Sequence, residues 1–162
     1  MTFTALSIIT LVLAFAAVVA TFVPRMPSAV ASFAALVCAH FAGAVYVDAK
    51  VIIFWGVATA IVLGLRILQP SGLVNSTRGH GYVALGTLAG VLLGYVCSPV
   101  AAALILGGCA GAFLGAVAFM RTPAGQLCAV TSQRFIDFLC AKGLPCVVTT
   151  SMAAISVASL II

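Results

Sequence analysis

Residues 85–117 read LGTLAGVLLGYVCSPVAAALILGGCAGAFLGAV. This stretch contains two copies of one sequence motif, with a Ser98-Pro99 turn between them. Each copy places a glycine at every fourth position, and these glycines are Gly86, Gly90, Gly94, Gly107, Gly111 and Gly115. Glycine at this spacing lines one face of a helix, so another backbone can approach closely. Because each mid-helix glycine costs about 1 kcal/mol relative to alanine, close packing must offset roughly 6 kcal/mol. The two copies therefore predict an antiparallel helical hairpin packed glycine face to glycine face.

The composition of the chain indicates a membrane protein. Of its 162 residues, 65% are hydrophobic and only 6% are charged, and the mean hydropathy is +1.36. A chain with so few polar side chains cannot cover its apolar surface in water, so lipid must be its solvent. The apolar stretches leave little room for a soluble module, which predicts one membrane domain over residues 1–162. The expected fold class is all-α, a polytopic transmembrane helical bundle.

Hydrophobic stretches and helix breakers divide the chain into about six spans. The first apolar run can cross about 30 Å of hydrocarbon, and we expect it to be retained rather than cleaved as a signal peptide. Pro24 and Pro27 end it in a tight hairpin, since proline lacks a backbone donor. The expected spans are residues 3–23, 29–47, 51–68, 80–97, 100–120 and 145–162. The glycine-rich pair is either two full crossings or a re-entrant hairpin that enters and leaves by one face.

One further helix is predicted at residues 123–142, before the last span. Thr122 is a candidate N-cap with Pro123 at the first helical position, and Lys142-Gly143 followed by Pro145 supplies a basic last turn and a stop. Polar residues fall on one stripe of this helix and apolar residues on the other side, which favours a position in the membrane interface. The polar stripe is Gln126, Gln133 and Asp137, and the apolar side is Leu127, Phe135, Phe138 and Leu139.

The basic side chains are distributed unevenly across the expected spans. If the spans alternate in direction, all but one of the Lys and Arg residues fall on one side of the membrane, and Lys50 falls on the other. The residues on the shared side are Arg25, Arg66, Arg78, Arg121, Arg134 and Lys142. The positive-inside rule then places these loops in the cytoplasm and both termini outside it. Attraction to anionic lipid accounts for the net charge of +5, so the charge gives no support to nucleic-acid binding.

The order of these features resembles a known family. A first span that ends in a P-x-x-P hairpin, a Gly-rich basic stretch and paired glycine-rich helices around a Ser-Pro turn are similar to the bacterial membrane proteins grouped as domain-of-unknown-function family 456. The resemblance covers most of residues 10–120, through Pro24, Pro27, Arg78, Gly79, Gly81, the six glycines and Pro99. The chain departs from the family at Arg25 and Ser28, where glycines are usual, and at 64–66, where acidic residues are frequent. The resemblance implies a helical fold in the bacterial cytoplasmic (inner) membrane and assigns no chemistry.

The sequence offers little for catalysis. The candidates for proton transfer are Asp48, Asp137, His40 and His80, and no two of them stand at a motif spacing. His40 is the candidate for depth in the membrane, and we expect it to bond a backbone carbonyl or a neighbouring Ser or Thr. The six cysteines form no C-x-x-C pair, and no phosphate-binding loop or nucleophile elbow is present. We therefore expect no catalytic, cofactor-binding or metal-binding residues, and no enzyme.

Two functions from different classes remain open. The first is a non-catalytic packing or assembly protein, whose glycine faces dock within the chain, against a second copy or against a membrane-protein partner, with lipid around them. The second is a small-solute transporter or channel, whose few polar contacts would be His40, Arg66, Arg78 and His80. A closed glycine seam favours the first function, and a polar, water-filled cavity near mid-membrane favours the second.

Overall fold

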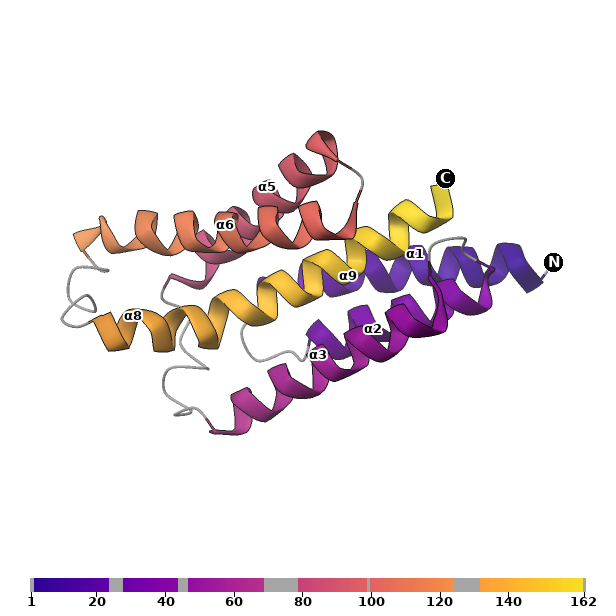
Figure 1. The fold of residues 1–162 in the computed structure, drawn as a ribbon, viewed down its shortest axis with the longest axis horizontal. Helices are drawn as coiled ribbons and strands as arrows, with labels where there is room; N and C mark the ends of the chain where they lie inside the picture. The colour runs from indigo at the N-terminus through magenta and orange to yellow at the C-terminus, as the bar shows by residue number, and fades with distance from the viewer. Residues whose placement is uncertain are drawn as a thin grey trace.

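The computed structural model describes residues 2–23, 28–43, 47–68, 79–98, 100–123 and 132–161. Within these ranges every regular element is helical, as expected from the composition, and the elements are α1 (Thr2–Ala20), α2 (Ser28–Phe41), α3 (Ala49–Leu68), α5 (His80–Cys97), α6 (Ala101–Met120), α8 (Ser132–Phe138), the π-helix η1 (Leu139–Gly143) and α9 (Leu144–Ile161) (Figure 1). Four helical stretches in this part of the chain are long and apolar enough to cross a membrane: Ala49–Leu68, His80–Cys97, Ala101–Met120 and Phe135–Leu160. Shorter apolar helices are Thr4–Ala20 and Ser28–Phe41.

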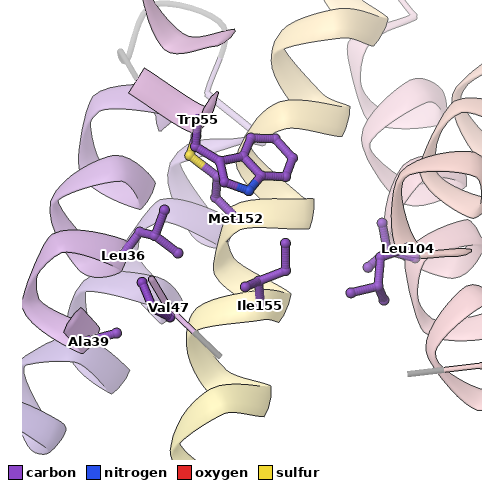
Figure 2. Packing of buried hydrophobic residues seen from close by; sticks show 8 residues of the cluster. Leu36, Ala39, Val47, Trp55, Leu104, Met152 and Ile155 are labelled. Atoms are coloured by element: carbon purple, nitrogen blue, oxygen red, sulfur yellow. The ribbon is translucent and has the colours of Figure 1, made fainter. Parts of the chain in front are cut away.

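The helix α9 lies at the centre of the bundle. It contacts α1, α2, α3, α5 and α6, and α5 and α6 form a closely packed pair, as α1 and α2 do (Figure 1). An apolar cluster joins Leu36 and Ala39 of α2 and Trp55 of α3 to Met152 and Ile155 of α9 (Figure 2). The central helix is therefore the element through which the two helix pairs and α3 are connected.

The helix α2 is shorter than the span predicted at residues 29–47. It ends at Phe41, and Gly43 adopts a left-handed backbone with a φ of 74°. A residue with a Cβ rarely takes this conformation, so the glycine ends the helix. His40 Nδ1 lies 2.6 Å from the carbonyl oxygen of Val47, which precedes α3. With 14 residues, α2 extends about 21 Å, which is less than the hydrocarbon thickness of a bilayer.

The helix α3 begins at Ala49, earlier than the predicted start at residue 51. Asp48 precedes it, and its carboxylate accepts the Ala49 N–H at 2.7 Å while its carbonyl accepts the Val51 N–H at 2.9 Å. Asp is among the favoured residues at helix N-termini, because a carboxylate can accept from backbone N–H groups that lack a partner within the helix. This start places Lys50 in the first turn of α3, whereas hydropathy alone places it in a loop.

The predicted break between an interfacial helix at 123–142 and a last span at 145–162 is wrong. The elements α8, η1 and α9 follow one another without interruption, and Phe135–Leu160 is one apolar stretch of 26 residues. Pro145 does not end the helix, because the preceding turn is wider: the Leu144 N–H bonds the carbonyl oxygen of Leu139. Such π-type turns accommodate a missing proline donor in membrane helices. Residues 124–131, with Gln126 and Leu127, lie outside the described part of the chain.

Successive long helices alternate in direction, so both termini lie at the same end of the bundle (Figure 1). Arg66 and Arg121 lie at the C-terminal ends of α3 and α6, which are at the opposite end. Lys50 lies in the first turn of α3, at the end of the termini. The described helices thus keep Lys50 apart from Arg66 and Arg121.

Candidate functional site

The helices α5 and α6 meet backbone to backbone along the repeated glycines. A Cβ on Gly90 would overlap the carbonyl oxygen of Gly107 and lie 3.0 Å from the Cα of Gly111. The relation is reciprocal, since a Cβ on Gly107 would overlap the Gly90 carbonyl oxygen, and Gly86 and Gly111 face each other in the same way. Any residue larger than glycine must therefore move one of the two backbones. We call this contact the glycine seam.

The seam extends along most of both helices. Towards the end of α5 a Cβ on Gly94 would overlap the carbonyl oxygen of Ala103, and towards its start a Cβ on Gly115 would overlap that of Tyr82. All six repeated glycines thus face the backbone of the opposite helix. The space between the two backbones leaves no room for a solute.

The structure describes Ser98 and Val100, the residues on either side of Pro99 between α5 and α6. Ser98 is extended and donates its N–H to the carbonyl oxygen of Gly94 at 3.0 Å. Val100 is also extended, and its carbonyl accepts the N–H of Ala103 at 3.0 Å at the start of α6. The predicted turn residues that lie outside the described part of the chain are Pro24, Pro27 and Pro99.

Other glycines have different surroundings. A Cβ on Gly108 would lie 3.0 Å from Val91 Cγ2 and 3.3 Å from Val147 Cγ1, so Gly108 faces side chains of α5 and α9 rather than backbone. A Cβ on Gly64 of α3 would meet nothing within 4 Å. The chain therefore contains closed, partly closed and open glycine positions, which provide matched comparisons.

The residues predicted as polar contacts of a solute path do not gather in one place. His40 lies in the last turn of α2, near the end of the termini, whereas Arg66 and His80 lie near the opposite end (Figure 1). Arg78 lies outside the described residues. His40, the candidate for depth in the membrane, lies one residue before the end of α2 rather than inside a longer helix. Its contact with the Val47 carbonyl is nevertheless a backbone contact of the kind expected for it.

Lys142 is a buried cation that the sequence pattern had placed in the last turn of an interfacial helix. The residue is 2% exposed, lies on η1, and has its Nζ 5.1 Å from the centre of the Phe138 ring. Phe138 in turn stacks on Phe119 of α6, with ring centroids 5.7 Å apart. Ionisable side chains inside membrane helices are costly and often functional. The sequence does not single out Lys142, because Pro145 resembles a helix stop and so places Lys142 at the end of a helix.

His80 lies close to Lys142. Its Nε2 is 2.6 Å from the carbonyl oxygen of Thr21, a contact that ties the start of α5 to the end of α1. Its Nδ1 is buried and has no hydrogen-bond partner among the described residues. Lys142 is near enough for its charge to act on the imidazole. Lys142 and an imidazole with one unpartnered nitrogen therefore form a buried basic pair.

The buried hydroxyl groups of α9 bond largely to their own helix. Thr150 and Ser156 each donate to the carbonyl oxygen four residues earlier, at 2.7 and 2.8 Å. Ser28 of α2 and Thr149 share a hydrogen bond of 3.2 Å between their hydroxyl oxygens. Ser151 Oγ is buried without a partner in the described part of the chain. Hydroxyl groups satisfied in this way are typical of packed membrane helices rather than of a polar path.

A groove lies between α3 and α6, and residues of η1 and α9 also line it. Two adjoining cavities form it, one of about 640 Å³ near Lys50 and one of about 310 Å³ near η1, and both are lined by Phe54, Trp55 and Ile105. Apart from Lys50 and Ser159, the lining is largely apolar. These volumes are in the range of small-molecule sites, which is roughly 300–1,000 Å³. We call this feature the α3–α6 groove.

Metal ligands do not gather in the part of the chain that the structure describes. No group of three His, Cys, Asp or Glu side chains there could hold a metal ion. The described cysteines are free, and they are Cys38, Cys97, Cys109, Cys140 and Cys146. Comparisons with protein-family models, with curated proteins and with solved structures found no match to this chain. The resemblance to family 456 therefore stays a prediction.

Proposed function

We propose that this chain is a non-catalytic integral membrane protein with a packing or assembly role, and that the α5–α6 contact acts as a glycine zipper. The observation that supports this role is the backbone-to-backbone contact at six glycines. The six glycines lower the intrinsic helix stability by roughly 6 kcal/mol relative to alanine. A requirement for a rigid hairpin would explain why the sequence keeps them.

A partner of the hairpin would bind to a face other than the glycine seam, because each helix already covers the glycines of the other. The outward faces of α5 and α6 carry exposed apolar side chains, among them Leu85, Leu92, Leu93, Val96, Leu106 and Leu114. This surface suits lipid, a second copy of the chain or another membrane protein. The rigid hairpin would hold these side chains in a fixed arrangement for that contact.

A matched pair of glycine substitutions tests the assembly role. Gly90→Leu forces the seam apart, whereas Gly64→Leu adds the same side chain where nothing lies within 4 Å. In mild detergent, the wild type and Gly64→Leu should be recovered in the same oligomer or complex, and Gly90→Leu should lose it. A wild-type chain that is monomeric both in detergent and after cross-linking in the membrane would contradict an assembly role.

We also propose that the chain has six membrane segments in a bacterial inner membrane, with both termini outside the cytoplasm. This follows from the charge asymmetry and from the alternating helices. In a chain with its cysteines replaced by serine, Thr2→Cys and Ile162→Cys should react with a membrane-impermeant maleimide added outside the cell. Pro123→Cys, after the end of α6, should not react. The reverse labelling pattern would show that the orientation is inverted.

A small-solute transporter or channel is the second candidate, and the buried Lys142 beside His80 is the observation that favours it. A cation at this depth could attract a small anion. Chloride or phosphate flux into vesicles containing the protein tests this idea, with Lys142→Met as the variant and Lys50→Gln as the control. Flux that Lys142→Met abolishes and Lys50→Gln retains would favour transport. Flux equal to that of empty vesicles would favour the packing role.

A further inference from the structure

We infer that the α3–α6 groove is a binding site for one acyl chain of an anionic phospholipid, whose head group lies beside Lys50. Trp55 and Ile105 line both cavities, so the two form one continuous apolar channel along the bundle. Lys50 lies at one end of this channel, in the first turn of α3, and is exposed. An apolar channel with a cation at its mouth matches the chemistry of an anionic lipid.

The length of the groove matches one leaflet of a bilayer. Along α6 its lining extends from Ala101 to Ala112, which corresponds to roughly 17 Å at 1.5 Å per residue. Half of the hydrocarbon core of a bilayer measures about 15 Å. An acyl chain that starts at the level of Lys50 would therefore reach the part of the groove that Ala112 and Gly143 line.

The charges at this end of the bundle favour an anionic head group. Lys50 is the only Lys or Arg between residues 42 and 65. The nearby acid, Asp48, is outside the groove lining, and its carboxylate accepts the Ala49 N–H. Ser159, the other polar residue of the lining, donates its hydroxyl to the carbonyl of Ser156 at 3.0 Å. The lysine ammonium is thus the group at the groove mouth that can bind a phosphate.

The lining of the groove suits an acyl chain of a lipid whose head group is negatively charged. Its walls are largely apolar, and Lys50 is the charged side chain at its mouth. Each buried methylene contributes about 0.8 kcal/mol where it replaces water. In a membrane that gain is absent, so the head group must provide the selectivity.

Trp55 can report on occupancy of the groove. It is the single tryptophan of the chain, is 4% exposed and lines both cavities. Brominated acyl chains quench tryptophan fluorescence on contact. Because little of Trp55 is exposed and both cavities border it, we expect bromine in the groove to be the quencher that comes closest to the indole.

The experiment uses the full chain in nanodiscs of unbrominated phosphatidylcholine. Brominated phosphatidylglycerol, which is anionic, or brominated phosphatidylcholine, which is zwitterionic, is then added in increasing proportion. We expect the anionic lipid to bind about five-fold more tightly than the phosphatidylcholine that it displaces, so that its half-maximal quenching comes at a lower mole fraction. A five-fold ratio of affinities corresponds to the ~1 kcal/mol attributed to one basic side chain at an anionic surface.

Two matched pairs of variants separate the head-group site from the acyl-chain site. Lys50→Gln should remove the preference for the anionic lipid, whereas Arg121→Gln, which removes a positive charge at the other end, should retain it. Ala58→Phe fills the groove and should reduce quenching by both lipids several-fold. Ala60→Phe adds the same ring at an exposed position of α3 outside the groove lining and should change nothing.

Several results would overturn the inference. Equal quenching of the wild type by the two lipids, or a preference that survives Lys50→Gln, would show that no head group binds at Lys50. Quenching that Ala58→Phe leaves unchanged would show that the chain does not enter the groove. Absence of quenching by either lipid would show that a second copy or another protein covers it. If inorganic phosphate abolishes the preference for the anionic lipid, Lys50 binds a soluble anion rather than a lipid head group.

Discussion

The two faces of α6 are packed in opposite ways. On one face Gly107, Gly111 and Gly115 meet the backbone of α5, with no side chain between the helices. On the other face Ile105 and Cys109 line a groove that α3 does not close. A single helix thus takes part in a contact with no spare volume and in one with several hundred cubic ångströms of it.

This difference shows how side-chain size determines the role of each interface. Where the side chains are absent, the helices approach until their backbones touch, and the contact resists any change in volume. Between α3 and α6, the bulky Phe54 and Trp55 line a space that no side chain fills. The glycine seam therefore fixes the shape of the hairpin, and the α3–α6 groove can accept a ligand.

The largest expected effect is at the centre of the seam. Gly90→Leu and Gly111→Leu must each force the α5 and α6 backbones apart, because the added side chain would overlap the opposite backbone. Overpacking of this kind should cost a few kcal/mol and lower the melting temperature in detergent. Leu92→Ala, at an exposed position of α5, should lower it less. Leucine variants that melt at the wild-type temperature would show that the seam faces lipid or an absent partner.

A smaller substitution should give effects of opposite sign at two glycines. Gly64→Ala in α3 should stabilise the protein by about 1 kcal/mol, since a Cβ there meets nothing and alanine is the better helix former. Gly90→Ala should destabilise it, by roughly 1–3 kcal/mol, because even a methyl group overlaps the Gly107 carbonyl oxygen. Thermal unfolding of the two variants in one detergent measures both. The comparison between closed and open positions fails if both shifts have the same sign.

The smallest expected effect is in the groove. Ala58→Phe places a ring in existing space and should change the free energy of unfolding by less than about 1 kcal/mol. The measurement is again thermal unfolding, with Ala60→Phe as the exposed control on the same helix. A loss as large as that of Gly90→Leu would mean that the groove is a closed interface in solution and that the contrast between the two faces of α6 is wrong.

The sequence contains most of the information on the hairpin. The predicted helices at 80–97 and 100–120 agree closely with His80–Cys97 and Ala101–Met120. Glycine spacing and the Ser98-Pro99 turn are local patterns, so a short window of sequence carries both. The all-α class also follows from the sequence. In lipid the backbone must bond within a helix or a closed barrel, and apolar runs of about 20 residues are typical of the helix.

The remaining features depend on contacts between distant parts of the chain. The α3–α6 groove combines residues near 50, 105 and 150, and no local pattern relates these segments. The early end of α2 depends on the φ of Gly43, which the apolar sequence around it does not indicate. The burial of Lys142 was missed because a proline after a glycine is a common helix stop, and the π-turn that accommodates Pro145 has no reliable sequence pattern.

The π-helix η1 also sets the rotation of α8 relative to α9. A π-turn contains about one residue more than an α-turn, and one residue corresponds to about 100° of rotation around the helix axis. With this turn in place, Phe135 contacts Phe113 at 5.7 Å between ring centroids and Phe138 stacks on Phe119 at the same separation. A regular α-helix through residues 139–143 would rotate α8 relative to α9 and would present a different side of it to α6. The five residues of η1 thus set which side of α8 faces the glycine hairpin.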